Sequence, residues 1–434
     1  MNDPLSRRKF LQAAVAAGTA LPAGFCWNVE PSTAAPAASP NEKLNLAVIG
    51  VAARGAANLH GVSSENIVAL CDIDAARLGT AAEQFPQAKT YADFRRVFDH
   101  TNLDGVVVST PDHMHAIPCA TALRAGLAVY CEKPLVHSVH EARVISRLTA
   151  ESGAATQMGN QIHNHPQANY RRVVEIIQAG VIGPVERVHV WKGGGVQPCQ
   201  RVALGSPPAG ISYDLWTGPA PFRPFHESHF HFKWRYWWDF GGGQLADFGC
   251  HYLDLPLWAL ELELPQTIAA TGEKGHDGDN DCPNHMRVEY TFAARGDKPP
   301  VHLTWYHGDW KPEGADVYNK GSAVLFEGTE GKLLADYTTR KLFMQTGREA
   351  RAVEPTIPDS PGHHREWIEA VKTGAPTTCN FEYGAKLTET VLLGNVSYRA
   401  GQQRLEWDAP QMRAANLPEA DRFIRREYRD GWTL

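Results

Sequence analysis

Short apolar runs alternate with helix-like stretches in the part of the chain that follows residue 40. The runs contain β-branched residues, which favour strands. Between them, apolar positions recur with a helical period, for example over 75–84, 92–98 and 138–150. The predicted strands are 44–49, 67–71, 89–91, 105–109, 127–131 and 154–158. Strands that alternate with helices in this way predict a doubly wound parallel sheet of the Rossmann type.

The pattern changes after residue 159. A helical segment over 166–179 ends at Gly180, and longer strands follow with few helices between them. The spacing of these strands predicts a second, α+β domain built on a mostly antiparallel open sheet. The predicted strands of this domain are 185–192, 268–272, 286–292, 300–306, 323–327 and 332–336.

An aromatic segment, 222–240, lies between the first two strands of the second domain, and a predicted helix over 244–260 follows it. Helical spacing places Asp247 and His251 at i and i+4 on one face of that helix. One interpretation makes them an acid at a helix N-terminus and a buried core histidine. The other makes them substrate ligands on a rigid element.

The first forty residues are typical of a processing signal. Arg7 and Arg8 precede an apolar stretch over 11–25 that is too short and too weakly hydrophobic to span a membrane. We interpret this as a twin-arginine export signal, which predicts a periplasmic or otherwise exported protein. The whole chain then divides into the signal and its linker (1–40), the Rossmann-type domain (41–159), the antiparallel-sheet domain (160–408) and a C-terminal extension (409–434).

Composition narrows the classes of partner. A net charge of −6 and the lack of a basic stripe argue against nucleic-acid binding. Eight cysteines without a C-x-x-C pair argue against a disulfide framework. The His-rich spots show no tight set of ligands with metal spacing, so no metal site is predicted. Twelve Trp and nineteen His residues suit the binding of polar rings such as sugars, although most Trp residues in proteins are core residues.

A degraded dinucleotide fingerprint follows the first strand. Gly50, Ala52 and Gly55 form the pattern G-x-A-x-x-G between a predicted strand and a predicted helix. Ala52 replaces the glycine that lets the backbone approach a pyrophosphate, so that a ligand would sit slightly farther out. The strand before the turn and the helix after it make the pattern far more specific than its glycines alone.

Asp72 ends the second strand, seventeen residues after Gly55. A carboxylate at this point can accept hydrogen bonds from the adenosine ribose and would repel a 2′-phosphate. NAD is therefore the predicted cofactor. Arg54 and Arg77 lie close enough in sequence to weaken this preference, and NADP stays an alternative.

Glu132 and Lys133 follow the fifth predicted strand and precede Pro134. The proline holds Lys133 in an extended conformation, and the bond between them is one of the few at which a cis peptide costs little. The pair therefore sits at the carboxyl end of a buried strand, where open α/β sheets bind ligands. Taken alone, the segment 131–134 is equally typical of an ordinary strand-to-helix loop with a surface lysine.

The dinucleotide fingerprint, followed by three further motifs, resembles the glucose-fructose oxidoreductase and inositol dehydrogenase family, known as Gfo/Idh/MocA. The resemblance covers about residues 43–408 and implies a Rossmann domain joined to an antiparallel-sheet domain whose exposed face forms homo-oligomers. It also implies oxidation or reduction of sugars, inositols and related polyols. The motifs are Thr110-Pro111-x-x-x-His115, Glu132-Lys133-Pro134 and Gly242-Gly243-x-x-x-Asp247-x-x-x-His251.

The resemblance implies a role for each matching residue. Lys133 would lie beside the nicotinamide, and Asp247 and His251 would form the substrate-domain pair. Gln161 and His163 follow the last Rossmann strand in a segment that departs from the sugar dehydrogenases, and we expect both to reach the substrate cleft. The residues expected to line the cofactor are Gly50, Ala52, Arg54, Gly55, Asp72, Thr110, Pro111, His115, Glu132 and Lys133.

Hydride transfer from a carbinol also requires that its hydroxyl proton leave. We expect His251 to take this proton with a pKa near neutrality. Lys133, partly desolvated beside the positively charged nicotinamide ring, is expected to have a lowered pKa and to polarise or relay the same proton. Asp247 would orient His251 or a second hydroxyl.

Three functions remain open on the sequence. The first is a sugar, glycoside or polyol oxidoreductase with a tightly held cofactor. The second is a redox-neutral NAD-dependent glycosidase that oxidises, eliminates, hydrates and reduces in turn. The third is a non-catalytic ligand-binding protein, which the presence of Lys133, Asp247 and His251 disfavours.

Overall fold

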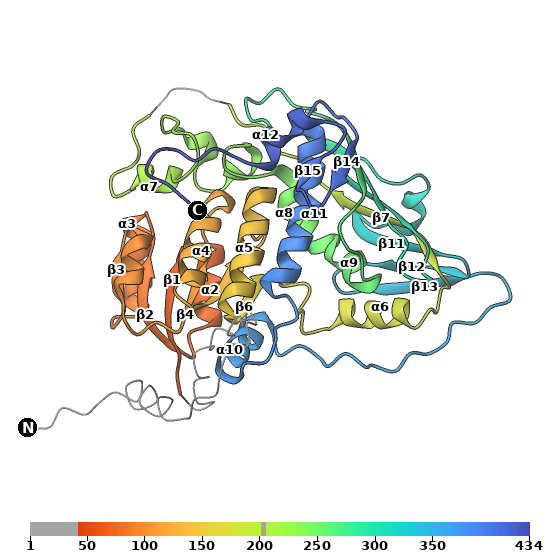
Figure 1. The fold of residues 1–434 in the computed structure, drawn as a ribbon, viewed down its shortest axis with the longest axis horizontal. Helices are drawn as coiled ribbons and strands as arrows, with labels where there is room; N and C mark the ends of the chain where they lie inside the picture. The colour runs from red at the N-terminus through yellow and green to blue at the C-terminus, as the bar shows by residue number, and fades with distance from the viewer. Residues whose placement is uncertain (1–41, 201–204) are drawn as a thin grey trace, which may run out of the picture. The chain divides into compact units, whose positions relative to one another are not determined.

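Two β-sheets organise the chain in the computed structural model, which describes residues 42–200 and 205–434 (Figure 1). The predicted twin-arginine signal and its linker lie outside the described residues. Among the helices that are described, none is both long and apolar enough to cross a membrane.

The first sheet is parallel and has the strand order β3-β2-β1-β4-β5-β6. The predicted Rossmann fold is therefore confirmed. Strand order reverses where β1 lies between β2 and β4, and ligands bind outside the carboxyl ends of the strands at such a point. The strands are β1 (Asn45–Ile49), β2 (Asn66–Cys71), β3 (Lys89–Tyr91), β4 (Gly105–Val108), β5 (Ala128–Glu132) and β6 (Thr156–Gly159).

Helices cover this sheet at α2 (Arg54–Gly61), α3 (Ala75–Gln84), α4 (Ala116–Arg124) and α5 (Val139–Ser152). The α5 helix begins with a capping box, in which Ser138 and Glu141 satisfy each other's backbone N–H groups. The helix predicted over 92–98 is instead a 3-10 turn, η1 (Phe94–Asp99). The Asp93 carboxylate accepts the Arg95 backbone N–H there, and so short a connection does not need a full α-helix.

The second sheet has nine strands in the order β13-β12-β11-β7-β10-β9-β8-β14-β15. The pair β7 and β10 is parallel, and the other described pairs are antiparallel, which confirms the predicted architecture. Beyond the six predicted strands, the sequence did not reveal β13, β14 and β15. The strands are β7 (Val185–Gly193), β8 (Thr267–Glu273), β9 (His285–Phe292), β10 (Val301–Gly308), β11 (Ser322–Gly328), β12 (Gly331–Ala335), β13 (Arg340–Met344), β14 (Leu405–Asp408) and β15 (Arg413–Ala414).

The helix predicted over 244–260 is divided into α8 (Gly243–Tyr252) and α9 (Asp254–Ala259). Pro256 explains the break, since it has no N–H to donate to the Tyr252 carbonyl and its ring crowds that carbonyl. Asp247 and His251 nevertheless remain one turn apart on α8.

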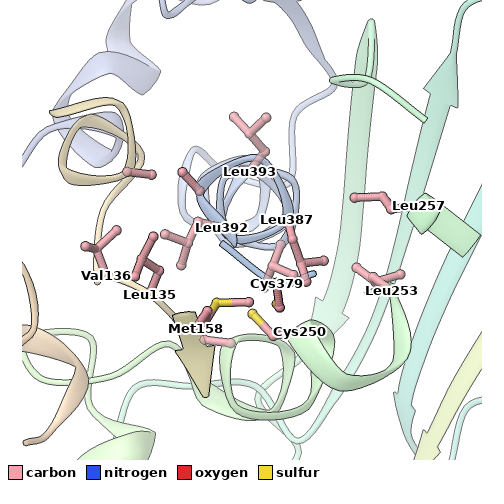
Figure 2. Packing of buried hydrophobic residues seen from close by; sticks show 14 of the residues in the cluster. Leu135, Val136, Met158, Cys250, Leu253, Leu257, Cys379, Leu387, Leu392 and Leu393 are labelled. Carbon is pink, nitrogen blue, oxygen red and sulfur yellow. The ribbon is translucent and has the colours of Figure 1, made fainter. Parts of the chain in front are cut away.

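The long helix α11 (Phe381–Arg399) joins the two sheets and packs against α5, α8 and β8 (Figure 1). Figure 2 shows leucines of α11 between Leu135 and Met158 of the first domain and Cys250 and Leu253 of the second. This core fixes α8 against the loop that follows β5. The remaining helices are α6 (Asn169–Gln178), α7 (Tyr213–Thr217), α10 (His363–Thr373) and α12 (Asp421–Ile424).

The C-terminal residues return to the Rossmann helices. Arg426 and Tyr428 both donate to the buried carboxylate of Glu141 on α5, and Trp432 stacks on Phe94. The segment after residue 408 therefore stabilises the first domain rather than extending away from it.

Candidate cofactor and substrate site

A cavity of about 540 Å³ lies at the carboxyl ends of β1, β2, β4 and β5. The second domain closes it with residues of α8 and of the aromatic segment 222–240. Of the residues singled out in the sequence, those that line the cavity are Gly50, Ala52, Arg54, Asp72, Thr110, Pro111, His115, Glu132, Lys133, Gln161, Asp247 and His251.

Two glycines let the chain turn tightly between β1 and α2. Gly50 has φ of +85°, and a Cβ there would lie 2.7 Å from the Ser109 carbonyl oxygen. A Cβ at Gly55 would lie 2.0 Å from the Gly50 carbonyl oxygen. Gly55 does not line the cavity, so its role is to let α2 begin close against the strand. Turn, helix and cavity together fit the pyrophosphate of a dinucleotide.

Ala53 adopts φ of +50° and ψ of −113°, a conformation that suits glycine. We expect Ala53→Gly to raise the free energy of unfolding by about 1 kcal/mol, because relief of this strain exceeds the added entropy of the unfolded chain. Thermal unfolding measures this. Ala52→Gly, in the same turn, is the control, and a lower melting temperature for Ala53→Gly would contradict the assignment of strain.

Asp72 lies where β2 ends and faces the cavity. Its carboxylate accepts the backbone N–H groups of Val51 at 3.0 Å and Asp74 at 3.1 Å, so its position is fixed. Burial raises the pKa of Asp72 above its ordinary value. Arg77 also lines the cavity, which keeps a contact with a 2′-phosphate geometrically open.

We expect Asp72→Ala to weaken NAD binding by about tenfold, the scale of one charge-assisted hydrogen bond, and to relax discrimination against NADP. Arg77→Ala is the matched control, because it should reduce NADP binding and leave NAD nearly unchanged. Titration of each variant with both nucleotides measures the effect. Unchanged selectivity in Asp72→Ala would place the ribose contact elsewhere.

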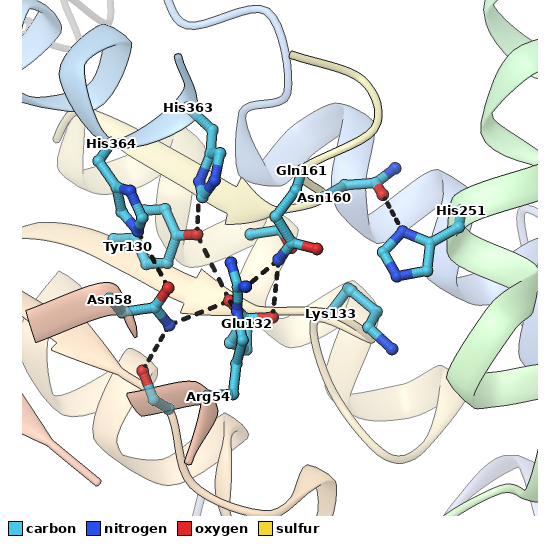
Figure 3. Close-up of polar contacts among 12 residues, drawn as sticks. Arg54, Asn58, Tyr130, Glu132, Lys133, Asn160, Gln161, His251, His363 and His364 are labelled. Carbon is cyan, nitrogen blue, oxygen red and sulfur yellow. Dashed lines mark hydrogen bonds and ion pairs between the residues drawn. The ribbon is translucent and has the colours of Figure 1, made fainter. Parts of the chain in front are cut away.

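The buried carboxylate of Glu132 is the centre of a polar network beneath the turn (Figure 3). It accepts hydrogen bonds from Arg54 Nε at 2.9 Å, Asn58 Nδ2 at 3.0 Å and Gln161 Nε2 at 3.2 Å. Glu132 therefore orients Arg54 and Gln161, both of which face the cavity. Nearby, His363 pairs with Tyr130 through a 2.8 Å hydrogen bond.

His115 connects the loop that follows β4 with the loop that follows β5 through hydrogen bonds. Its ring nitrogens lie 2.8 Å from the carbonyl oxygens of Thr110 and Pro134. The peptide between Lys133 and Pro134 is cis. His115 thus fixes the loop that carries Lys133, and burial lowers the pKa of its imidazole.

Lys133 and Asp247 form an ion pair across the two domains. Lys133 Nζ lies 2.6 Å from Asp247 Oδ1, and Arg235 Nε lies 3.6 Å from the same oxygen. Burial alone would raise the pKa of Asp247, but the two cations lower it to about 2. Burial likewise acts to lower the pKa of Lys133, but Asp247 outweighs it and the pKa is raised. The prediction of a lowered lysine pKa is therefore wrong in this structure.

His251 is oriented by Asn160 rather than by Asp247 (Figure 3). Asn160 Nδ2 donates to the Cys250 carbonyl at 2.8 Å, so its Oδ1 is the atom that faces His251 Nδ1 at 2.7 Å. Nδ1 therefore carries the proton, and Nε2 is left as an acceptor. Burial, and then the charge of Lys133, lower the pKa of His251 well below its usual range. The expected near-neutral pKa is wrong, and the ring is neutral.

His163 does not reach the cavity. Its Nδ1 lies 3.0 Å from both carboxylate oxygens of Asp254, and its ring stacks on Trp258 with centroids 4.0 Å apart. Asp254 is fully buried and needs such a partner. The expectation that His163 binds substrate is corrected, whereas Gln161 lines the cavity as expected.

Several cavity residues were not singled out in the sequence. Asp112 is buried beside the Lys133 loop, and burial raises its pKa to about 7 against the opposing effect of Arg235. The aromatic segment was noticed, but its contribution to the cavity was not. Among the described residues, no group of three or more His, Cys, Asp or Glu side chains is arranged to hold a metal ion. The additional lining residues include Asp112, Trp216, His231, Phe232, Trp234, Arg235 and Phe248.

The match between this chain and its curated relatives covers only part of each relative's length. A glycosyl hydrolase family 109 protein of Stenotrophomonas maltophilia (strain K279a) is 33% identical over 144 residues, which are 30% of this chain and 29% of that protein. Inositol 2-dehydrogenase of Corynebacterium glutamicum (strain R) is 28% identical over 155 residues, which are 34% of this chain and 46% of that protein. The chain thus spans less than half the length of these two relatives.

A solved structure shares the fold over most of both chains. WlbA dehydrogenase from Chromobacterium violaceum, determined in complex with NADH and UDP-GlcNAcA, has a TM-score of 0.65 and 17% identity. The likeness covers 86% of this chain and 98% of that one.

Two family models cover most of the chain. Residues 44–160 match the NAD-binding Rossmann fold of the oxidoreductase family, and residues 173–434 match its C-terminal alpha/beta domain. The geometry of the turn after β1 and the position of Asp72 agree with the first match. The chain therefore belongs to the Gfo/Idh/MocA oxidoreductase family, with an N-terminal NAD-binding Rossmann domain.

Proposed function

We propose that the protein is an NAD-dependent oxidoreductase that acts on a hydroxyl or keto group of a sugar, glycoside or polyol and keeps its cofactor bound. One observation carries this proposal. Lys133, Asp247 and His251 converge on the cavity that also holds the dinucleotide turn. When bound, NAD accepts a hydride from the substrate carbon, and NADH returns one.

The chain supplies the proton chemistry. A substrate hydroxyl beside Lys133 Nζ receives a hydrogen bond from it, and Asp247 holds the amine in place. His251 Nε2 is the acceptor that Asn160 leaves available, so it takes the hydroxyl proton as the carbon is oxidised. In the reverse direction, the proton returns from Nε2 to the carbonyl oxygen of the substrate as the carbon is reduced.

A carbohydrate suits the walls of this cavity. Trp216, Trp234 and Phe248 supply apolar aromatic surface. Gln161, whose Nε2 donates to Glu132 and to the Gly159 carbonyl, supplies an acceptor oxygen, and Arg235 supplies hydrogen-bond donors. Pockets that combine apolar walls with a few placed polar groups bind small molecules with defined orientation. A sugar ring presents apolar C–H faces and a polar rim, which match both kinds of wall.

A redox-neutral glycosidase is the second candidate. Oxidation of a ring hydroxyl acidifies the neighbouring C–H, the glycosidic group then leaves, water adds, and the same cofactor reduces the product. The relative named as a glycosyl hydrolase family 109 protein favours it. The same Lys133 and His251 would serve the oxidation and the final reduction.

We further propose that the twin-arginine signal exports the folded protein with its cofactor already loaded. Because free NAD is not expected outside the cytoplasm, the enzyme must restore its cofactor in place. This favours ping-pong exchange between two sugars or redox-neutral hydrolysis. The open face of the second sheet is the proposed homo-oligomer surface, and the solution mass tests it.

Purified holoprotein mixed with a panel of sugars and nitrophenyl glycosides separates these functions. An oxidoreductase yields an oxidised sugar together with NADH absorbance. A glycosidase releases nitrophenol with no net change in NADH. When the reaction is run in D2O, its product carries deuterium at the carbon next to the one that is transiently oxidised. If no substrate alters the bound dinucleotide and no product forms, the enzymatic proposal is wrong and the protein binds ligands without catalysis.

A further inference from the structure

The segment from His231 to Arg235 passes along the cavity from one end to the other. His231 Nε2 lies 3.3 Å from Asp74 Oδ2, and Asp74 donates its backbone N–H to Asp72 at the ribose end. At the opposite end, Arg235 pairs with Asp247 beside Lys133. A dinucleotide that reaches from Asp72 to Lys133 would therefore lie beneath this segment.

Backbone contacts fasten the preceding residues to the Rossmann domain. Ser212 N donates to the Ile73 carbonyl at 2.8 Å, and Ala75 N donates to the Gly210 carbonyl at 3.0 Å. Figure 1 shows α7, which these residues precede, on the α3 side of the first sheet. The part of the chain that leads into the aromatic segment is thus attached to the loop after β2 independently of the His231 contact.

Phe232 is unusual among the residues of this segment. Its side chain is 57% exposed although it lines the cavity, and the Arg235 guanidinium lies 4.6 Å from the centre of its ring. Exposed large apolar side chains are rare in the described part of the chain and comprise Phe222, Phe232 and Val317. Of these three, Phe232 alone faces the cavity. A bound dinucleotide would cover this ring, which removes the cost of leaving it in water.

We propose that the segment His231–Arg235 is a cofactor-binding element contributed by the second domain, in which Phe232 contacts the bound dinucleotide. The contact of His231 with Asp74 and the ion pair of Arg235 with Asp247 hold the segment in place, and the cofactor leaves when these contacts break. This inference rests on the proposed function, because it assumes that the cavity binds NAD along its length. It gives a physical reason for slow cofactor exchange.

Release of NADH tests the element without any sugar substrate. Wild-type protein and its variants are loaded with NADH and then mixed with a large excess of NAD, and the loss of bound NADH fluorescence gives the dissociation rate. We expect Phe232→Ala to release NADH about tenfold faster, the scale of one lost aromatic contact, and Phe232→Tyr to stay close to wild type.

Phe222→Ala is the matched control, because Phe222 lies in the same aromatic segment, is 56% exposed and does not face the cavity. Its release rate should remain within about twofold of wild type. Equal release rates for Phe232→Ala and wild type would overturn the inference and leave the proposed function intact. A chain that binds and releases NADH as expected but turns over no sugar would instead overturn the proposed function alone.

Discussion

Lys133→Met is expected to lower kcat by about 10²-fold or more on the true substrate, the usual scale for loss of an acid–base group. Methionine keeps the length of the side chain but removes the ammonium that Asp247 holds at the cavity wall. NAD should stay bound, since the turn after β1 and Asp72 are untouched. Steady-state kinetics together with the dinucleotide content of the variant measure both effects.

Lys192→Met is the matched control for this change. Lys192 lies near the site, with its Nζ 4.1 Å from the centre of the Phe248 ring, but it does not line the cavity. Its kcat should remain within a few fold of wild type. Equal losses in the two variants would show that Lys133 acts through general charge or packing rather than at the substrate.

His251→Ala should also lower kcat by about 10²-fold or more, because it removes the Nε2 acceptor for the hydroxyl proton. Asn160→Ala leaves the imidazole in place and removes its orienting acceptor, so we expect a smaller loss of about tenfold. The ratio of kcat in the two variants separates proton transfer from positioning. A His251→Ala enzyme with near wild-type kcat would remove this residue from the proposed chemistry.

The fold was predictable because its signals are local. A buried strand such as β4, Gly105–Val108, is recognisable because its residues are apolar and mostly β-branched. The alternation of such strands with helices then restricts the possible topologies. The break between α8 and α9 also had a visible cause in Pro256, but the apolar spacing on either side of it continued in register. β14 and β15 are short and offer little periodicity, so the sequence did not reveal them.

The site was predictable where motifs follow strand ends, as for Asp72 and Lys133. Asn160 and Arg235 were missed because tertiary packing alone brings them to His251 and Asp247. The direction of the Lys133 pKa was wrong for the same reason. Desolvation was foreseen, but the carboxylate that outweighs it lies 114 residues away in sequence.

His163 shows the opposite error. Its position two residues after Gln161 suggested the same cavity, but the turn after β6 directs the two side chains to different partners. Gln161 donates to Glu132, whereas His163 pairs with the buried Asp254 of α9. The helical pattern of apolar residues does not reveal that the Asp254 carboxylate is fully buried. The sequence therefore did not show that this carboxylate needs His163 as a partner.

The dinucleotide content of the purified protein tests the central claim most directly. Mature protein prepared without added nucleotide is denatured, and the supernatant is assayed for NAD and NADH. The account predicts about one NAD(H) per chain and a dissociation constant well below micromolar, which corresponds to more than roughly 8 kcal/mol of binding. A protein that is purified empty and binds NAD only weakly would contradict the account of a tightly held cofactor in this cavity.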